Sequence, residues 1–263
     1  TEFPGLLFLG PLVTTSAVHG GGGLPATPVS HCYFSSAWYV LLSNGDIYKW
    51  STTDSHWDLA YDGTVASAHP QALCSHGGYM FVARGSSAYL YTNDGTNYTT
   101  ATVTDNDATG FLSAPAATGI GTVLWKFGYS NNQIASHSTG LNGTEWSTPA
   151  YIGESSNVAT SLILHQDRLL VGTTWGLYHY DSDGATYKLL GAEDLSDPGH
   201  SDNFKYHTHL KGSTYFSMYN QIGELTGGDA FRYVEPTQFV EDYDLVLGKC
   251  EGLAADQNNL YAC

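Results

Sequence analysis

The feature that most constrains this chain is a repeat of about 44 residues. Short apolar runs recur at intervals of 41, 44, 45, 46 and 45 residues. Their centres are Val40, Phe81, Trp125, Leu170, Phe216 and Tyr261. No window shows helical periodicity, so each repeat is predicted to be a small unit of β-strands.

Aromatic residues fix the register of this repeat. Four of them follow their run centre by 17 residues: Trp57, Tyr98, Tyr187 and Tyr233. In the third repeat Trp146 follows by 21 residues, which an insertion within residues 128–140 explains. Pairs such as Asp94-Gly95 and Asn142-Gly143 precede the aromatics and favour tight hairpin turns.

One repeat therefore predicts four antiparallel strands, which is the content of a β-propeller blade. The first strand is short and has small side chains, which suits the crowded inner end of a blade. Examples are residues 72–74, 112–114, 162–164 and 252–254. The apolar run is the second strand, an alternating stretch is the third, and the fourth carries the aromatic residue.

The two ends of the chain predict a shared blade. Residues 5–8 resemble a third strand, residues 11–16 a fourth, and the C-terminal end supplies a first and a second strand. We therefore expect a single domain over residues 1–263. Its predicted fold is an all-β, six-bladed propeller with four antiparallel strands per blade and the last blade shared between the termini. The alternative is a fragment of a longer array cut within a blade.

Two segments resemble known propeller repeats. Residues 170–181, with their Gly-Thr turn and Gly-Leu-Tyr-x-Tyr-Asp ending, look like the repeat of regulator-type propellers. The turn at residues 92–98 is similar to the Asp-box of sialidase-like propellers, although it is one residue short and ends in Tyr. Neither resemblance implies a particular activity, because propeller blades carry many functions.

The charge of the chain limits its partners. Nine Lys and Arg residues against 25 Asp and Glu residues give a net charge of −16. Such a surface repels phosphate backbones, so we expect no nucleic acid partner. No apolar run approaches the roughly 20 residues of a membrane helix, so we expect no membrane insertion.

Binding residues are predicted where propeller loops gather at one mouth. Turns between second and third strands supply the candidate ligand-binding residues Asn44, Arg84, Tyr129, Trp175 and Tyr219. Together with acidic connecting loops, they could hold a sugar, a cation or a basic protein surface. The alternative is a solvated face of an acidic protein.

Two groups of residues raise the question of a metal. Asp105 and Asp107 open a calcium-like Asp-x-Asp-x-x-Gly loop, but position twelve holds Ala116 where calcium loops have Glu. Loop-forming turns without metal are the alternative. His207 and His209 would share one strand face, but the sequence specifies no third ligand. Calcium is the one cofactor that we consider, and otherwise we expect none.

The four cysteines predict structural staples. Cys250 and Cys263 flank the last predicted hairpin, so a disulfide between them would close a short loop worth about 3 kcal/mol. Cys32 and Cys74 lie on inner strands of successive blades and either pair or remain small buried thiols.

The predicted function is that of a non-catalytic β-propeller that is extracellular, secreted or on a virion or cell surface. It would act as a structural and binding module, through self-assembly into a filament, coat or tail structure or through surface recognition of a protein. Few Lys and many Tyr residues suit protein contacts. The alternatives are a lectin-like propeller that stacks sugars on Trp175, Tyr129 and Tyr219, and a sialidase-like glycoside hydrolase. A sialidase-like site needs three arginines around a carboxylate. The three arginines of this chain occupy different strand positions and need not converge, so we expect that it is not an enzyme. They are Arg84, Arg168 and Arg232.

Overall fold

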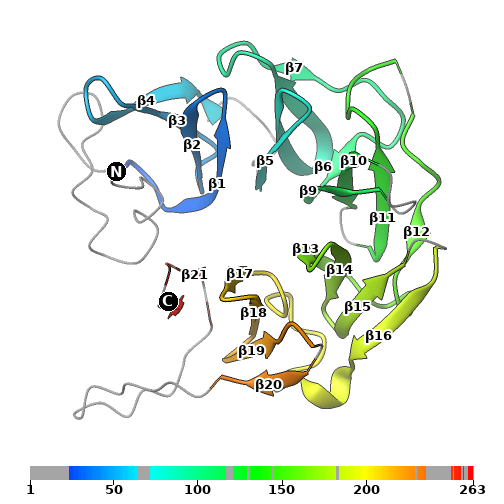
Figure 1. Ribbon diagram of the computed structural model, residues 1–263. Coiled ribbons are helices and arrows are strands. Elements are labelled where there is room, and N and C mark those ends of the chain that lie inside the picture. Colours follow the sequence, from blue (N-terminus) through cyan, green and yellow to red (C-terminus); the bar gives the residue numbers. More distant parts are fainter. Residues whose placement is uncertain are drawn as a thin grey trace, which may run out of the picture. The chain divides into compact units, whose positions relative to one another are not determined.

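A computed structural model describes most of the chain, and its regular structure is almost entirely β-strand. It describes residues 24–63, 72–116, 121–128, 131–143, 145–181, 184–228, 230–234, 250, 252–255, 257 and 260–262. The chain divides into two compact units, residues 1–150 and 151–263. Figure 1 shows their strands grouped into successive sheets.

The first sheet of unit 1 pairs four consecutive strands in chain order. They are β1 (Pro28–Phe34), β2 (Ala37–Leu42), β3 (Ile47–Ser51) and β4 (His56–Tyr61). Tyr39, Leu41 and Ile47 are fully buried in its core. Alternating apolar residues thus place one face of each strand against the interior.

Two more sheets follow in unit 1, and the last strand of the second one spans the unit boundary. One contains β5 (Ala72–His76), β6 (Tyr79–Thr92), β7 (Thr99–Thr100) and β8 (Asp107–Ala108). The other contains β9 (Gly110–Pro115), β10 (Thr122–Phe127), β11 (Gln133–His137) and β12 (Ala150–Tyr151). The long strand β6 pairs with β5 through its first half and with β7 through its second half.

Unit 2 has two four-stranded sheets and one pair of strands. The first sheet contains β13 (Ala159–His165), β14 (Arg168–Thr173), β15 (Gly176–Tyr180) and β16 (Thr186–Leu190). After the 3-10 helix η4 (Ala192–Asp194), the second contains β17 (His207–Leu210), β18 (Ser213–Met218), β19 (Gln221–Leu225) and β20 (Phe231–Tyr233). The pair is β21 (Leu253–Ala255) and β22 (Leu260–Ala262).

The predicted number of blades is wrong. In the described residues the structure has five four-stranded antiparallel blades, not six, and β21 pairs only with β22. The sixth blade required residues 5–8 and 11–16 as partners, and these lie outside the described residues. Strand patterns at the two ends of a sequence do not by themselves specify that these strands pair. Here β21 and β22 are hydrogen-bonded to each other, and this pairing does not require strands from the N-terminal end.

Buried histidines link the first strand of a blade to the next blade within each unit. His76 ends β5, and its Nδ1 atom lies 2.9 Å from the Ser113 hydroxyl of β9. His165 ends β13, and its Nδ1 atom lies 2.7 Å from the Thr214 hydroxyl of β18. The two histidines occupy equivalent positions, so the repeat extends to the contacts between blades.

Candidate functional site

The predicted binding residue Asn44 fixes its own turn. Its amide donates to an Asp46 carboxylate oxygen at 2.7 Å, and its carbonyl oxygen accepts from the Asp46 N–H at 3.2 Å. The other carboxylate oxygen of the buried Asp46 accepts from the Gly63 N–H at 2.9 Å. These bonds hold the turn between β2 and β3 against the end of β4.

Arg84 is engaged within its own strand. Its guanidinium donates to the Ala88 carbonyl oxygen, from Nε at 2.7 Å and from a second nitrogen. Gly85 and Ala88 also pair with β8, so the bend in β6 is fixed from both sides. Tyr129, another predicted binding residue, lies outside the described residues.

The last two predicted binding residues lie in a common surface of unit 2. Trp175 occupies the turn between β14 and β15 and is 40% exposed. Tyr219 occupies the turn between β18 and β19, and its ring centroid lies 4.2 Å from that of His200. Gly199 lies against the Trp175 ring, because a methyl group added to Gly199 would come within 3.2 Å of that ring. We call Trp175, Gly199, His200 and Tyr219 the Trp175 strip.

The loop at residues 195–206 is held in place by buried groups. The Thr174 carbonyl oxygen accepts from the Gly199 N–H at 2.8 Å and from the Asn203 side chain at 3.1 Å. The Phe204 side chain is fully buried, and its N–H donates to the Ser217 carbonyl oxygen at 2.6 Å. The strip is therefore presented by a fixed loop.

A buried carboxylate compensates the positive charge of Lys205 in this loop. Asp202 is 2% exposed and lies 3.4 Å from the Lys205 ammonium and 3.4 Å from His200 Nδ1. The backbone N–H of Asp202 donates to His200 Nδ1 at 3.1 Å. These contacts orient the His200 ring, whose face meets Tyr219.

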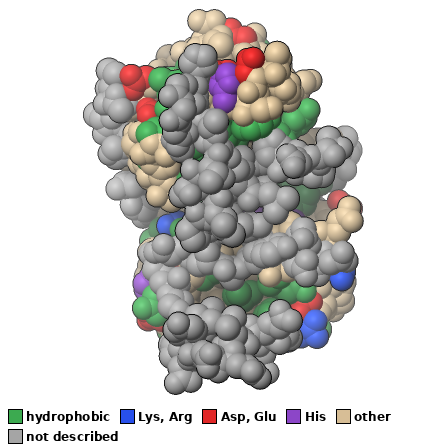
Figure 2. Space-filling model, turned by 90° about the vertical axis from the view of Figure 1, so that its left-hand side faces the viewer, with side chains coloured by type: hydrophobic (Ala, Val, Ile, Leu, Met, Phe, Trp, Pro, Cys, Tyr) green, Lys and Arg blue, Asp and Glu red, His purple; other side chains and the backbone are tan. Residues whose placement is uncertain are grey.

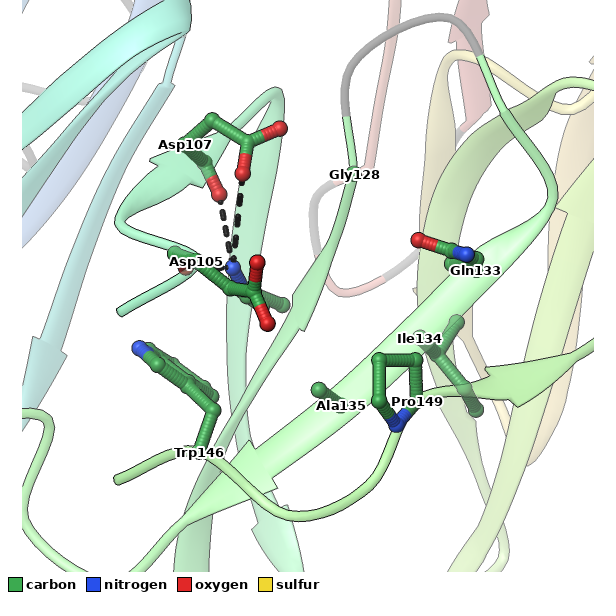
Figure 3. A pocket seen from close by; sticks show the side chains of 9 residues that line it. Asp105, Asp107, Gly128, Gln133, Ile134, Ala135, Trp146 and Pro149 are labelled. Atoms are coloured by element: carbon green, nitrogen blue, oxygen red, sulfur yellow. Dashed lines mark hydrogen bonds and ion pairs between the residues drawn. The ribbon is translucent and has the colours of Figure 1, made fainter. Parts of the chain in front are cut away.

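A second candidate place is a pocket in unit 1 around Lys126. Asp105, Gln133, Trp146 and Pro149 contribute to its lining (Figure 3). The cavity holds about 30 Å³, close to the volume of one water molecule. It lies beside an open groove of about 460 Å³ that also touches Asp105, Trp146 and Pro149.

The ammonium group of Lys126 lies at the predicted calcium loop. It donates to the backbone carbonyl oxygens of Asp105 and Asp107, the latter at 2.9 Å, and lies 3.8 Å from an Asp107 carboxylate oxygen. It also lies 4.9 Å from the centre of the Trp146 ring. Burial lowers the pKa of Lys126, and the neighbouring carboxylates partly offset this effect. Calcium at Asp105 and Asp107 stays a prediction, and the described residues include no group of three side chains suited to a metal.

The predicted histidine pair belongs to a cluster of three imidazoles. The Thr214 hydroxyl lies 2.9 Å from His209 Nδ1 and 2.7 Å from His165 Nδ1. The His207 and His209 ring centroids are 6.3 Å apart. Burial, together with a smaller effect of the nearby His209, lowers the pKa of His207 to about 4. Burial also lowers the pKa of His209, so the rings of His207 and His209 are neutral at pH 7.

The predicted bridge between Cys32 and Cys74 is absent, because both residues are free thiols. Burial raises the pKa of the Cys74 thiol to about 12 and that of Cys32 further, so they behave as small apolar side chains. Cys250 is buried, with its sulfur 3.5 Å from the Gly252 carbonyl oxygen. Cys263 lies outside the described residues, so the pairing of Cys250 with Cys263 stays a prediction.

Comparison with known proteins identifies the fold. No protein-family model and no curated protein matches the chain. Among solved structures it is similar to the extracellular domain of a putative one-component system from B. thetaiotaomicron, with a TM-score of 0.64 and 11% identity. That match covers 90% of this chain and 31% of the other. The fold is a β-propeller.

Two further structures share this propeller fold. A streptogramin B lyase has a TM-score of 0.63 and 9% identity, over 97% of this chain and 78% of the other. An auxiliary nutrient binding protein from Bacteroides thetaiotaomicron has a TM-score of 0.62 and 12% identity, over 90% of this chain and 66% of the other. At such identities the similarity establishes the fold alone. This chain also spans only about a third of the length of that extracellular domain.

Two features of the candidate sites were not identified from the sequence: the loop residues of the Trp175 strip and the lysine of the pocket in unit 1. His200 and Gly199 join Trp175 to Tyr219, but they lie in a long loop without periodicity. Lys126 was hidden within an apolar run, where a lone lysine among Leu, Trp and Phe was the available signal.

In the part of the chain that the structure describes, no helix is long and apolar enough to cross a membrane.

Proposed function

We propose that this chain is a non-catalytic surface module that self-associates through the outer strands of its blades. The observation that carries the proposal is the position of the exposed large apolar side chains, most of which lie on the outer strands. The described residues expose seven of them, and four lie on fourth strands: Leu59, Tyr151, Tyr187 and Tyr233. Their exposed fractions are 53%, 64%, 51% and 47%.

A fourth strand is the edge of its sheet, so these side chains lie beside backbone groups that no neighbouring strand covers. Tyrosine combines a large apolar ring with a hydroxyl group, and it is enriched at protein interfaces. Repeated tyrosines on equivalent edges give one chain several contact points for further copies.

Charged residues on the same edges favour side-chain contact over continuous strand pairing. Lys188 of β16 pairs with Glu193 at 3.3 Å, and Arg232 of β20 pairs with Glu224 at 2.5 Å. Charges on edge strands hinder the addition of further strands. The edges therefore suit a defined association more than open-ended sheet growth.

The remaining support concerns location and chemistry. Two of the similar structures are described as an extracellular domain and a nutrient binding protein, which supports a surface role for this chain. The arginines argue against a sialidase-like activity. The guanidinium groups of Arg84 and Arg232 already bind partners in their own blades. Figure 2 shows acidic, basic, histidine and hydrophobic side chains on the described part of one face. The net charge of −16 makes the chain a poor partner for polyanions.

Sedimentation velocity over a wide concentration range tests this proposal, with negative-stain images of the same samples. The wild type should form oligomers or polymers, and the triple variant Y151S/Y187S/Y233S should remain monomeric at the same concentrations. Y33S is the matched control, because Tyr33 is 55% exposed on the first strand β1. A wild type that stays monomeric, or a triple variant that assembles equally well, would overturn the proposal.

A further inference from the structure

We propose that the Trp175 strip of unit 2 is a binding site for a neutral glycan. This inference is independent of self-association, because the strip lies on loops and turns and the associating tyrosines lie on outer strands. It rests on an exposed aromatic ring, a second aromatic pair beside it, and polar groups held along the same loop.

The first requirement for sugar stacking is a ring that is exposed and fixed. The Trp175 backbone N–H donates to the Thr173 hydroxyl oxygen at 3.3 Å, and that hydroxyl donates to the Gly176 carbonyl oxygen at 3.0 Å. The neighbouring Thr174 is hydrogen-bonded to Val158 through both its N–H and its side chain. A rigid turn thus presents the ring with little loss of entropy on binding.

The second requirement is a close approach of the loop, and glycine provides it. Gly199 has a φ angle of +92°, a conformation that other residues rarely adopt. Its lack of a side chain lets the backbone lie against one edge of the Trp175 ring. The next residue, His200, packs its ring against Tyr219, so one loop contacts both Trp175 and Tyr219.

Tyr219 is held in an unfavourable backbone conformation. Its φ angle is +59°, which costs about 1 kcal/mol or more for a residue with a bulky side chain. The Tyr219 carbonyl oxygen accepts from the Cys250 N–H at 2.8 Å, which fixes this conformation. Strain of this kind is concentrated at binding sites, where it fixes the direction of a side chain.

Polar groups suited to sugar hydroxyls lie on the same loop and turn. The Ser196 hydroxyl lies 2.8 Å from the Asn220 amide oxygen and 3.2 Å from the Met218 carbonyl oxygen. Asp197 is exposed, and its backbone carbonyl oxygen accepts from Asn203. The loop and the turn therefore carry amide and carboxylate groups as well as aromatic rings, whose faces attract the C–H bonds of a sugar ring.

Charge and size select the ligand class. The one lysine in this loop, Lys205, is paired with Asp202, and Asp197 adds an exposed negative charge. A sulfated or acidic glycan would meet repulsion here, whereas a neutral one would not. The strip is only a few side chains wide, while a stable protein interface needs about 800 Å² per partner.

A glycan microarray followed by titration with the neutral oligosaccharides that bind tests this site. Trp175→Ala should weaken binding about tenfold or more, Trp175→Phe should weaken it less, and Tyr219→Ala should also reduce it. Tyr33→Ala, which removes a 55% exposed ring on β1, should bind like the wild type. Circular dichroism of each variant checks that it is folded.

Three outcomes would overturn the inference. They are an array silent for neutral glycans, binding that survives Trp175→Ala, and preferential binding of acidic glycans that salt abolishes. Since Trp175 is not on an outer strand, Trp175→Ala should leave the sedimentation behaviour unchanged. Failure of the glycan site and failure of self-association are therefore distinguishable.

Discussion

Replacement of His207 by glutamine should remove part of the acid sensitivity of this protein. His207 is packed in β17 beside His209, and its Nδ1 atom is buried without a hydrogen-bond partner in the described residues. Burial makes the imidazolium form unfavourable in the folded state, which lowers the pKa of His207 to about 4. The unfolded chain keeps the ordinary value of 6.5.

The sign follows from proton linkage. Between these two pKa values the unfolded state binds a proton that the folded state does not, so the free energy of unfolding falls as the pH falls from 6.5 towards 4. At about 1.4 kcal/mol per pKa unit, the full shift corresponds to about 3 kcal/mol. Partial exposure of the residue reduces the expected loss to about 2 kcal/mol.

Urea unfolding at about pH 7.5 and about pH 4.5 measures this loss, as the difference between wild type and His207→Gln. The comparison cancels the titration of carboxylates, which is common to both proteins. The variant should lose about 2 kcal/mol less stability on acidification than the wild type. His179→Gln on β15, outside the cluster, is the control and should behave like the wild type. Equal losses in wild type and His207→Gln would refute the reasoning.

Three further predictions concern stability and reactivity. Lys126→Met should lower the free energy of unfolding by about 2 kcal/mol in urea titrations, because two carbonyl oxygens lose a charged donor. Gly95→Ala should lower the melting temperature markedly, since Gly95 has a φ angle of +75° and the added methyl would come within 2.0 Å of the Tyr39 hydroxyl oxygen. Cys32 and Cys74 should react with a thiol reagent at pH 8 only after unfolding, because burial raises the pKa of both. Reaction at the same rate in the folded protein would contradict the raised pKa values.

Much of the blade structure was predictable because it is encoded locally and repeated. The predicted first strands at residues 72–74, 112–114 and 162–164 lie within β5, β9 and β13. Alternation and turn residues decide such elements within a few positions of the chain. The number of blades was not predictable in this way, because it depends on whether strands from opposite ends of the sequence pair.

The aromatic positions show a second limit of the repeat. Trp57 and Tyr187 are equivalent in sequence, yet Trp57 is 1% exposed and Tyr187 is 51% exposed. The ring of Trp57 packs against Trp50 at 5.2 Å, whereas Tyr187 lies beside His179 on a more polar strand. Register fixes where a residue lies along a strand, but the neighbours on the adjacent strand decide whether its side chain is covered.

Among the predicted binding residues that the structure describes, only those whose side chains make no hydrogen bond within their own turn remain candidates for binding a ligand. Asn44 and Arg84 share the strand position of Trp175, but each has a backbone or carboxylate group of its own turn within reach. In the described residues the Trp175 ring has no comparable partner, and a loop more than twenty residues further along the chain comes to lie beside it. A polar residue in a tight turn therefore predicts a turn, whereas a large aromatic residue at the same position predicts a surface that another segment or a ligand covers. By this reasoning Tyr219 and Trp175 are the positions of the predicted mouth at which a substitution should change binding more than stability.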